Sequence, residues 1–167
     1  AIILEPVSTQ SQIDTLCAIA KTVWHETYDD LLPPGQPDYM IEKFQSDHAV
    51  KEQMARENYR YVLAKLGEAY VGFVGYAPRY QGQEEMYLSK AYILPQGRGQ
   101  GVVGALFRLV EEETKKEGLS RVRLTVNKGN AHAKAVYEHY GYRTVEAVQS
   151  DIGGGYVMDD YVMVKEL

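Results

Sequence analysis

The chain has little cysteine and no long apolar run, and each shortage excludes a class of protein. Its single cysteine, Cys17, rules out an internal disulfide and a cysteine-rich metal centre. No stretch reaches the roughly 18 consecutive apolar residues of a membrane-spanning helix, and no basic segment precedes the opening AIILEPV. We therefore expect a soluble, cytoplasmic protein with no membrane partner.

Basic residues are also in short supply, because 18 lysines and arginines stand against 23 acidic residues and the net charge is -5. Nonspecific binding to nucleic acid needs a basic face, so no nucleic acid partner is expected. The histidines have no spacing with acids or cysteine that would form a metal site, and no metal is expected. Tyrosine, in contrast, is plentiful: its 14 residues suit a half-wet cleft as well as the margin of a core.

The length of 167 residues is enough for one domain with a proper core and too short for two. No linker, internal repeat or low-complexity tract divides it, so we predict a single domain over residues 1–167. Apolar periodicity and turn residues predict strands at 2–6, 59–66, 69–76, 86–94, 121–126, 142–149 and 156–165. They predict helices within 8–32, within 37–58 (one or two), at 102–117 and at 131–140.

Two of these helices allow finer predictions. Ser11 and Asp14 form a capping-box pattern at the start of the first helix, and Cys17 falls on its apolar face. For the helix at 102–117 we expect Val103, Leu106, Leu109 and Val110 to be buried, and Glu111 to pair with Lys115 and Glu112 with Lys116.

The stretch LPQGRGQGVVGALF, residues 94–107, joins an apolar strand to a helix through a loop dense in glycine. Glycines let the backbone approach a ligand closely, and the free amides at the start of the helix attract an anion. This junction therefore suits a pyrophosphate group.

Two common nucleotide sites fit the surroundings poorly. Gly99, Gly101 and Gly104 spell the dinucleotide fingerprint GxGxxG, but an acidic residue is then expected about 20 positions later, at the end of the next strand. That strand ends in Asn127 instead. A phosphate-binding P-loop is excluded because no Gly-Lys-Ser/Thr follows the glycines.

The glycine stretch and the block VNKGNAHAKAVYEHYGYR, residues 126–143, together resemble the GCN5-related N-acetyltransferases (GNAT family). The first block resembles the family's motif A with Arg98 and Gly101, except that Val103 stands where glycine or alanine is expected. The second resembles motif B with Asn130, Ala133, Val136–Tyr137 and Tyr140–Tyr142. More loosely, residues 24–33 and the ending YVMDDYVMVKEL are similar to the PaiA-like polyamine acetyltransferase branch.

The resemblance implies an α/β fold with a mixed sheet: mostly antiparallel strands, two parallel strands that splay apart, and flanking helices. The cofactor, acetyl-CoA, would lie in the gap, its pantetheine arm against the backbone of Ala91 and Ile93. The resemblance places the remaining cofactor contacts at Arg98, Gly99, Gln100, Gly101, Val102, Val103, Gly104, Asn130 and Tyr137.

The implied reaction moves acetyl from acetyl-CoA to an amine, and by resemblance Tyr137 supplies a proton to the leaving thiolate. From the residues alone, Tyr137 could equally be a buried aromatic and Asn130 a helix cap. The general base stays open. Ser89 occupies the position where many relatives have a glutamate, which leaves Glu84, Glu85, Tyr87 or a water molecule.

In this fold residues 24–33 form one wall of the acceptor cleft, so we expect Trp24, Glu26, Tyr28 and Asp29 to bind the substrate, with carboxylates for an ammonium group and aromatic rings for cation-π contact. A solvated helix end is the alternative for the carboxylates. The substrate is expected to be a small amine such as a polyamine. Transfer to a protein or peptide amine, or a non-catalytic CoA-binding module, are the alternatives, and a homodimer stays open as the assembly.

Overall fold

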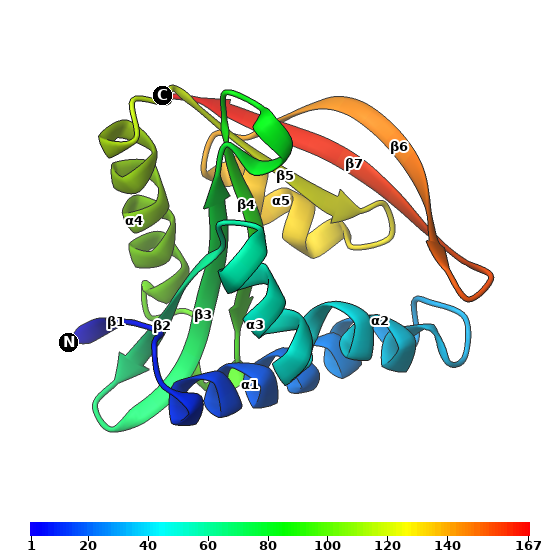
Figure 1. Ribbon diagram of the computed structural model, residues 1–167, viewed down its shortest axis with the longest axis horizontal. Coiled ribbons are helices and arrows are strands. Elements are labelled where there is room, and N and C mark those ends of the chain that lie inside the picture. Colours follow the sequence, from blue (N-terminus) through cyan, green and yellow to red (C-terminus); the bar gives the residue numbers. More distant parts are fainter.

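The computed structural model describes residues 1–167. All of its strands belong to one seven-stranded sheet (Figure 1). The strand order is β1-β2-β3-β4-β5-β7-β6. All neighbours pair antiparallel except β4 and β5, which run parallel. The predicted mixed sheet is thus confirmed.

The elements follow the predicted order. The strands are β1 (Ile2–Pro6), β2 (Arg60–Leu66), β3 (Ala69–Pro78), β4 (Met86–Ile93), β5 (Arg121–Asn127), β6 (Arg143–Gly153) and β7 (Tyr156–Glu166). The helices are α1 (Gln10–Tyr28), α2 (Gln36–Gln45), α3 (Asp47–Arg56), α4 (Val102–Lys116) and α5 (Ala131–His139). None of these helices is long and apolar enough to cross a membrane.

The parallel pair opens after a very short contact. β4 and β5 are paired only at Met86 with Val122 and at Tyr87 with Arg123. Further along, β4 still pairs with β3 as far as Ile93, and β5 pairs with β7 as far as Asn127. Each strand therefore keeps its outer partner while its inner edge is free, which confirms the predicted splay.

The sheet carries helices on both faces (Figure 1). On one face α4 and α5 cover a core that includes Leu106, Phe107 and Leu124. On the other face α1 and α3 cover a second core around Leu16 and Phe73. A small third cluster, Trp24, Met40 and Ile152, joins α1 and α2 to the β6–β7 hairpin.

The cap of α1 differs from the prediction. Thr9, not Ser11, precedes the helix: its hydroxyl accepts from the Gln12 amide at 3.2 Å, and Gln12 Oε1 accepts from the Thr9 amide at 2.9 Å. Thr9 has an extended backbone that directs its hydroxyl at the first turn. Ser11 already lies inside the helix, where its carbonyl accepts from the Thr15 hydroxyl.

The face of α4 is also rotated from the expected one. Val102 and Phe107 are buried against the sheet, whereas Val103 and Leu109, both predicted to be buried, are only half-buried at the edge of the core. The helix begins directly at Val102, so this residue and not Val103 faces inward.

The predicted ion pairs along α4 were wrong as well. Glu111 pairs with Lys165 of β7 at 3.0 Å, and Lys116 pairs with Glu113 at 3.5 Å. Glu111 is partly buried where α4 meets the sheet, so it meets a cation from the sheet sooner than one from its own helix. The final hairpin is longer than predicted, because β6 continues to Gly153.

Candidate active site

The turn before α4 needs glycine for two different reasons. Gly99 and Gly101 have φ angles of 74° and 82°, in the left-handed region that favours glycine. Gly97 is needed for packing, because an added Cβ would lie 2.7 Å from the Cβ of Val71. Gly104 packs 3.1 Å from the Tyr140 hydroxyl on the same measure.

The amide end of α4 is free of side-chain caps. Gly101 is the N-cap residue and contributes no side chain, and no other side chain caps the first turn. An added Cβ at Gly99 would meet nothing within 4 Å, so the outside of the turn is open. Uncapped amides with open space before them form a site for an anion.

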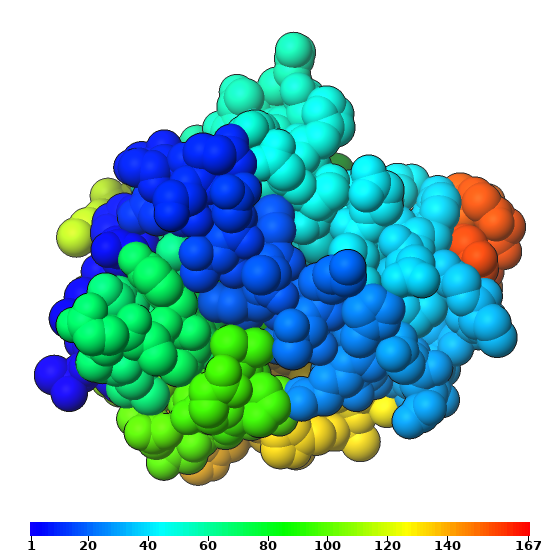
Figure 2. Space-filling model, turned by 90° about the horizontal axis from the view of Figure 1, so that it is seen from below, coloured from blue at the N-terminus to red at the C-terminus, as the bar shows by residue number.

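Arg98 is engaged within the protein. Its Nε and Nη2 donate to the Ile93 carbonyl at 3.2 and 3.0 Å, and Nη2 also pairs with Glu26 of α1. This contact places the glycine-rich segment against the end of α1, as Figure 2 shows for the lime-green and blue segments. Gln100 likewise folds back, donating from Nε2 to the Gln96 carbonyl at 2.9 Å.

The other residues predicted to contact the cofactor lie around the gap. Ala91 pairs with Val74 of β3 and has no partner on the side of β5. Val102 is buried under the turn, and the half-buried Val103 packs against the main core instead of filling the turn. Asn130 caps α5, accepting at Oδ1 from the Ala133 amide at 3.2 Å.

Tyr137 of α5 stands in an aromatic cluster beside the gap. Its ring stacks on Phe107 with centroids 5.8 Å apart and meets the edge of Tyr142 at 5.9 Å. Burial raises the pKa of Tyr137 well above its usual value, and the neighbouring phenols of Tyr28 and Tyr87 raise it further. The hydroxyl is therefore protonated throughout the neutral range.

A cleft of about 630 Å³ opens on the other face of the sheet. α2 and α3 form one wall, and residues of β4, β5 and the β6–β7 hairpin form the other. Its inner end is aromatic: Trp24 Nε1 donates to the Tyr92 hydroxyl at 2.9 Å, and Gln45 Nε2 donates to the same oxygen at 3.3 Å.

The residues predicted to bind substrate are only partly brought together. Trp24 lines the cleft, and its ring packs at a tilt of 39° against the half-buried Tyr28, with centroids 4.4 Å apart. Glu26 pairs with Arg98 beside the glycine turn, and the Asp29 carboxylate accepts from His25 Nδ1 at 2.8 Å at the exposed end of α1. Neither carboxylate lines the cleft.

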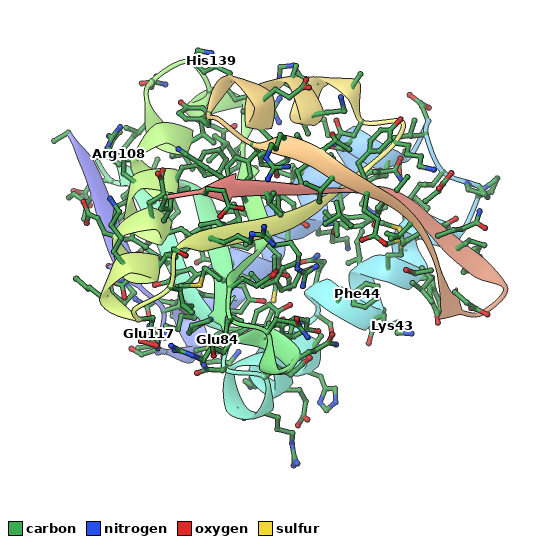
Figure 3. The ribbon with its side chains drawn as sticks, turned by 90° about the horizontal axis from the view of Figure 1, so that it is seen from above. Lys43, Phe44, Glu84, Arg108, Glu117 and His139 are labelled. Atoms are coloured by element: carbon green, nitrogen blue, oxygen red, sulfur yellow. The ribbon has the colours of Figure 1, made fainter.

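The candidate bases are also separated. Glu84 is exposed and pairs with Arg79 at 3.2 Å, and Figure 3 places it near Glu117, far from Lys43 and Phe44 of the cleft. Glu85 pairs with Arg123. Tyr87 does line the cleft.

Three cleft residues escaped the sequence analysis. Lys90 is buried and donates to the Phe44 carbonyl at 2.6 Å and to Gln53 Oε1 at 3.0 Å, and burial lowers its pKa to about 7. Asp160 is buried too: burial first, then Asp159, raise its pKa to about 6. Asp160 Oδ1 and Gln45 Oε1 have no hydrogen-bond partner. For Asp160 the sequence did contain a signal: this acidic residue occupies the same face of its strand as the apolar Val162 and Val164.

A family model described as the acetyltransferase (GNAT) family matches residues 23–142. Uncharacterized N-acetyltransferases of Mycobacterium bovis and Mycobacterium tuberculosis are 36% identical over 95 residues. That match covers 56% of this chain and 60% of the length of these relatives.

Solved structures share the fold at low identity. A PaiA N-acetyltransferase of Thermoplasma acidophilum, solved in complex with coenzyme A, has a TM-score of 0.80 at 19% identity and covers 100% of this chain and 99% of its own. A GCN5-related N-acetyltransferase of Rhodopseudomonas palustris has a TM-score of 0.79 at 16% identity, with 99% and 95% covered. A ribosomal-protein-alanine N-acetyltransferase of Brucella melitensis has 0.71 at 19%, with 99% of both chains covered.

Proposed function

We propose, because the chain belongs to the acetyltransferase (GNAT) family, that it transfers acetyl from acetyl-CoA to a primary amine. The observation that carries this proposal is the gap between β4 and β5, which ends at an uncapped glycine turn. A free strand edge offers backbone groups to an extended amide-containing ligand, and the turn offers amides to its pyrophosphate.

In this proposal the pantetheine arm follows the free edge of β4 near Ala91 and Ile93, and the pyrophosphate lies on the turn from Arg98 to Gly104. Arg98 uses only Nε and Nη2 in its contacts with Ile93 and Glu26, so its Nη1 is available to a phosphate, and Nη2 can exchange the Glu26 carboxylate for the same group. A guanidinium that moves from one acceptor to a phosphate keeps its charge paired throughout.

Tyr137 is the proposed acid. It lies beside the gap with its phenol protonated, and no hydrogen bond contributes to its raised pKa, so its proton is available to a thiolate. The phenols of Tyr28 and Tyr87 raise the pKa of Tyr137 after burial, and they raise the pKa of Tyr92 as well.

For the acceptor we propose a small amine, with a polyamine as the leading candidate. α2 is fastened to the β6–β7 hairpin, because Tyr39 and Lys43 donate to the Ile152 carbonyl at 2.7 and 2.5 Å and Gln36 donates to the Val157 carbonyl at 2.9 Å. These bonds hold the cleft shut along one side. A small amine enters without breaking them, and the resemblance of residues 24–33 and of the ending YVMDDYVMVKEL to the polyamine acetyltransferase branch favours a polyamine.

A peptide amine is the second candidate, favoured by the likeness to the ribosomal-protein-alanine N-acetyltransferase. A non-catalytic CoA-binding module is the third, favoured by Val103 at the glycine or alanine position of the family motif and by the internal contacts of Arg98. The homodimer and the cytoplasmic location expected from the sequence stay predictions.

Ligand-induced stabilisation tests the first step. At a hundredfold excess over its dissociation constant acetyl-CoA should stabilise the protein by about 2.7 kcal/mol, while NADH should not. Melting without any shift would contradict the proposal. Thiol release is then followed with spermidine, spermine, butan-1-amine and an alanine-starting peptide. Turnover only with the peptide would favour the second candidate, and binding of acetyl-CoA without turnover for any amine the third.

A further inference from the structure

Asp160 is a buried carboxylate that the fold leaves without a partner. It lies on β7, opposite Asn127 of β5 and Val148 of β6, and 8% of its surface is exposed. Its Oδ1 accepts no hydrogen bond, although it lines the cleft. A buried acceptor without a donor is costly, so such a group points to a ligand that brings a donor.

A second orphan acceptor lines the same cleft. Gln45 of α2 is 3% exposed, its Nε2 is used by the Tyr92 hydroxyl, and its Oε1 has no partner. The two unmet atoms are both acceptors and come from the two opposite walls. The complement of two acceptors is a group with several N–H donors and no lone pair, which describes an alkylammonium ion.

The charges around Asp160 favour the same ligand. Asp159 and Lys128 act on it most directly, and they pair with each other at 2.8 Å. Neither of these two lines the cleft; besides Asp160, the charged or basic side chains that do are Glu42, Lys43, His48, Glu52, Glu57 and Lys90. Both lysines direct their nitrogen at protein oxygens, Lys43 at Ile152 and Lys90 at Phe44 and Gln53. Lys128 lowers the pKa of Asp160 less than burial and Asp159 raise it, and neither lysine of the cleft pairs with Asp160. The cleft as a whole therefore attracts cations.

Asp160 and Tyr137 come from opposite sides of the sheet: Asp160 lines the cleft, and Tyr137 packs against the core beneath α4 and α5. Asp160 acts electrostatically on Tyr28, whose pKa is raised mainly by burial. Tyr28 in turn acts on Tyr137 and Tyr92. The phenol of Tyr28 is thus a common neighbour of both groups, with the acid on the α5 side of the gap and the carboxylate on the cleft side.

The geometry points to Asp160 as the residue that binds the acceptor's ammonium group and takes its proton, with Gln45 Oε1 as a second acceptor in the cleft. This inference rests on the proposed acetyl transfer and names its base and substrate class: primary alkylammonium ions with an apolar stem for the aromatic end of the cleft.

The protons balance in this scheme. The ammonium group gives one proton to the Asp160 carboxylate. The neutral nitrogen bonds to the thioester carbonyl carbon, and the carbon–sulfur bond breaks as the tetrahedral intermediate collapses. Tyr137 protonates the departing thiolate and regains a proton from the nitrogen, which became positive on attack. Asp160 returns its proton to solvent, so each acetyl transfer releases one proton.

The raised pKa of Asp160 suits this task. With a value near 6 the carboxylate is ionised at neutral pH, yet it is a stronger base than an ordinary aspartate. Asp160→Asn keeps the shape and removes the base. Asp159→Asn is the matched control, because Asp159 is the adjacent acid, half exposed and paired with Lys128. Asp160→Glu tests whether a displaced carboxylate restores activity in part.

The experiment measures turnover and binding separately. Binding of butan-1-amine and of butan-1-ol in the presence of CoA is followed by calorimetry at pH 7.5, and kcat/KM for butan-1-amine is followed from pH 5 to 9. We expect the wild type to bind the amine and not the alcohol, with kcat/KM rising through pH 6. Asp160→Asn should lower kcat/KM about 10²-fold or more and bind the amine at least about tenfold more weakly.

The controls separate this inference from the proposed function. Asp159→Asn should keep turnover, with the rise in kcat/KM moved to lower pH, and Asp160→Glu should recover part of the activity. Amine binding and turnover by Asp160→Asn within twofold of the wild type would overturn the role of Asp160 and leave acetyl transfer intact. If the wild type binds acetyl-CoA and amine without turnover, the proposed reaction fails, and amine binding by Asp160→Asn still decides whether Asp160 holds the ammonium group.

Discussion

The glycine turn before α4 and the cleft beneath α2 both adjoin β4, but they are made of different chemical groups. The turn consists of backbone: left-handed Gly99 and Gly101, and amides that no side chain caps. The cleft consists of side chains from distant segments, among them Trp24, Gln45 and Asp160. A site made of backbone depends on conformation and is indifferent to pH. A site made of buried side chains depends on ionisation.

The cleft, unlike the turn, contains buried ionisable groups whose charged forms are destabilised. Burial pushes the pKa of Lys90 down to about 7 and that of Asp160 up to about 6, so each group resists its charged form. Lys90 is compensated by two hydrogen bonds, and Asp160 by none at Oδ1. Functional residues often lower the stability of the folded protein, and an unpartnered buried polar group is one way in which they do so. We therefore expect that removing such a group from the cleft raises the free energy of unfolding, whereas no change in the turn should do so.

The largest effect is expected at Tyr137, beside the gap between β4 and β5. Tyr137→Phe should lower kcat by about 10²- to 10³-fold, because the thiolate then leaves without its acid. Stabilisation by acetyl-CoA should be unchanged, since the ring still stacks on Phe107. Tyr142→Phe is the matched control, because that ring packs on Phe107 as well and should keep turnover. Equal turnover by both variants would assign the proton to water or to the substrate.

Asp160→Asn should change the free energy of unfolding, because it removes a buried carboxylate that destabilises the folded protein when it is ionised. Because the folded pKa, about 6, lies above the ordinary aspartate value of 3.8, ionisation opposes folding. The stability of the wild type is full below pH 4 and falls as the pH rises through 6. The variant should therefore match the wild type near pH 4 and be more stable by on the order of 2 kcal/mol at pH 7. Urea unfolding at the two pH values measures this, and a variant that is less stable at pH 7 would contradict it.

Gly101→Ala tests the backbone-built region. A left-handed alanine costs about 1 kcal/mol, and the distorted turn should also weaken acetyl-CoA binding. Gly118→Ala is the control, because Gly118 has a φ of 74° with nothing within 4 Å of an added Cβ and lies at the other end of α4. The two variants should lose similar stability by thermal unfolding, and only Gly101→Ala should lose affinity. Equal affinity in both would remove the turn from the cofactor site.

The same contrast explains how far the sequence could be interpreted. The turn lies in one continuous stretch whose glycines, strand and helix are local signals, and the splay of β4 and β5 followed from a family resemblance. Gln45 and Asp160 line one cleft only because α2 docks on the β6–β7 hairpin, and no local pattern encodes that docking. The cap of α1 was predicted wrongly for a milder reason: Thr9 and Ser11 are both residues that cap helices, and the chain leaving β1 selects Thr9.

The smallest effect is expected from a change at Glu26, which tests to which of the two regions this residue belongs. The sequence predicted that Glu26 binds the substrate, whereas the structure pairs it with Arg98 of the turn. Glu26→Gln should free Arg98 for a phosphate and tighten acetyl-CoA binding a few-fold, a change of less than about 1 kcal/mol as expected for an exposed pair. The KM for the amine should stay the same. Asp29→Asn, at the same helix end but paired with His25, should change neither value. A higher KM for the amine with unchanged acetyl-CoA affinity would instead return Glu26 to the acceptor side.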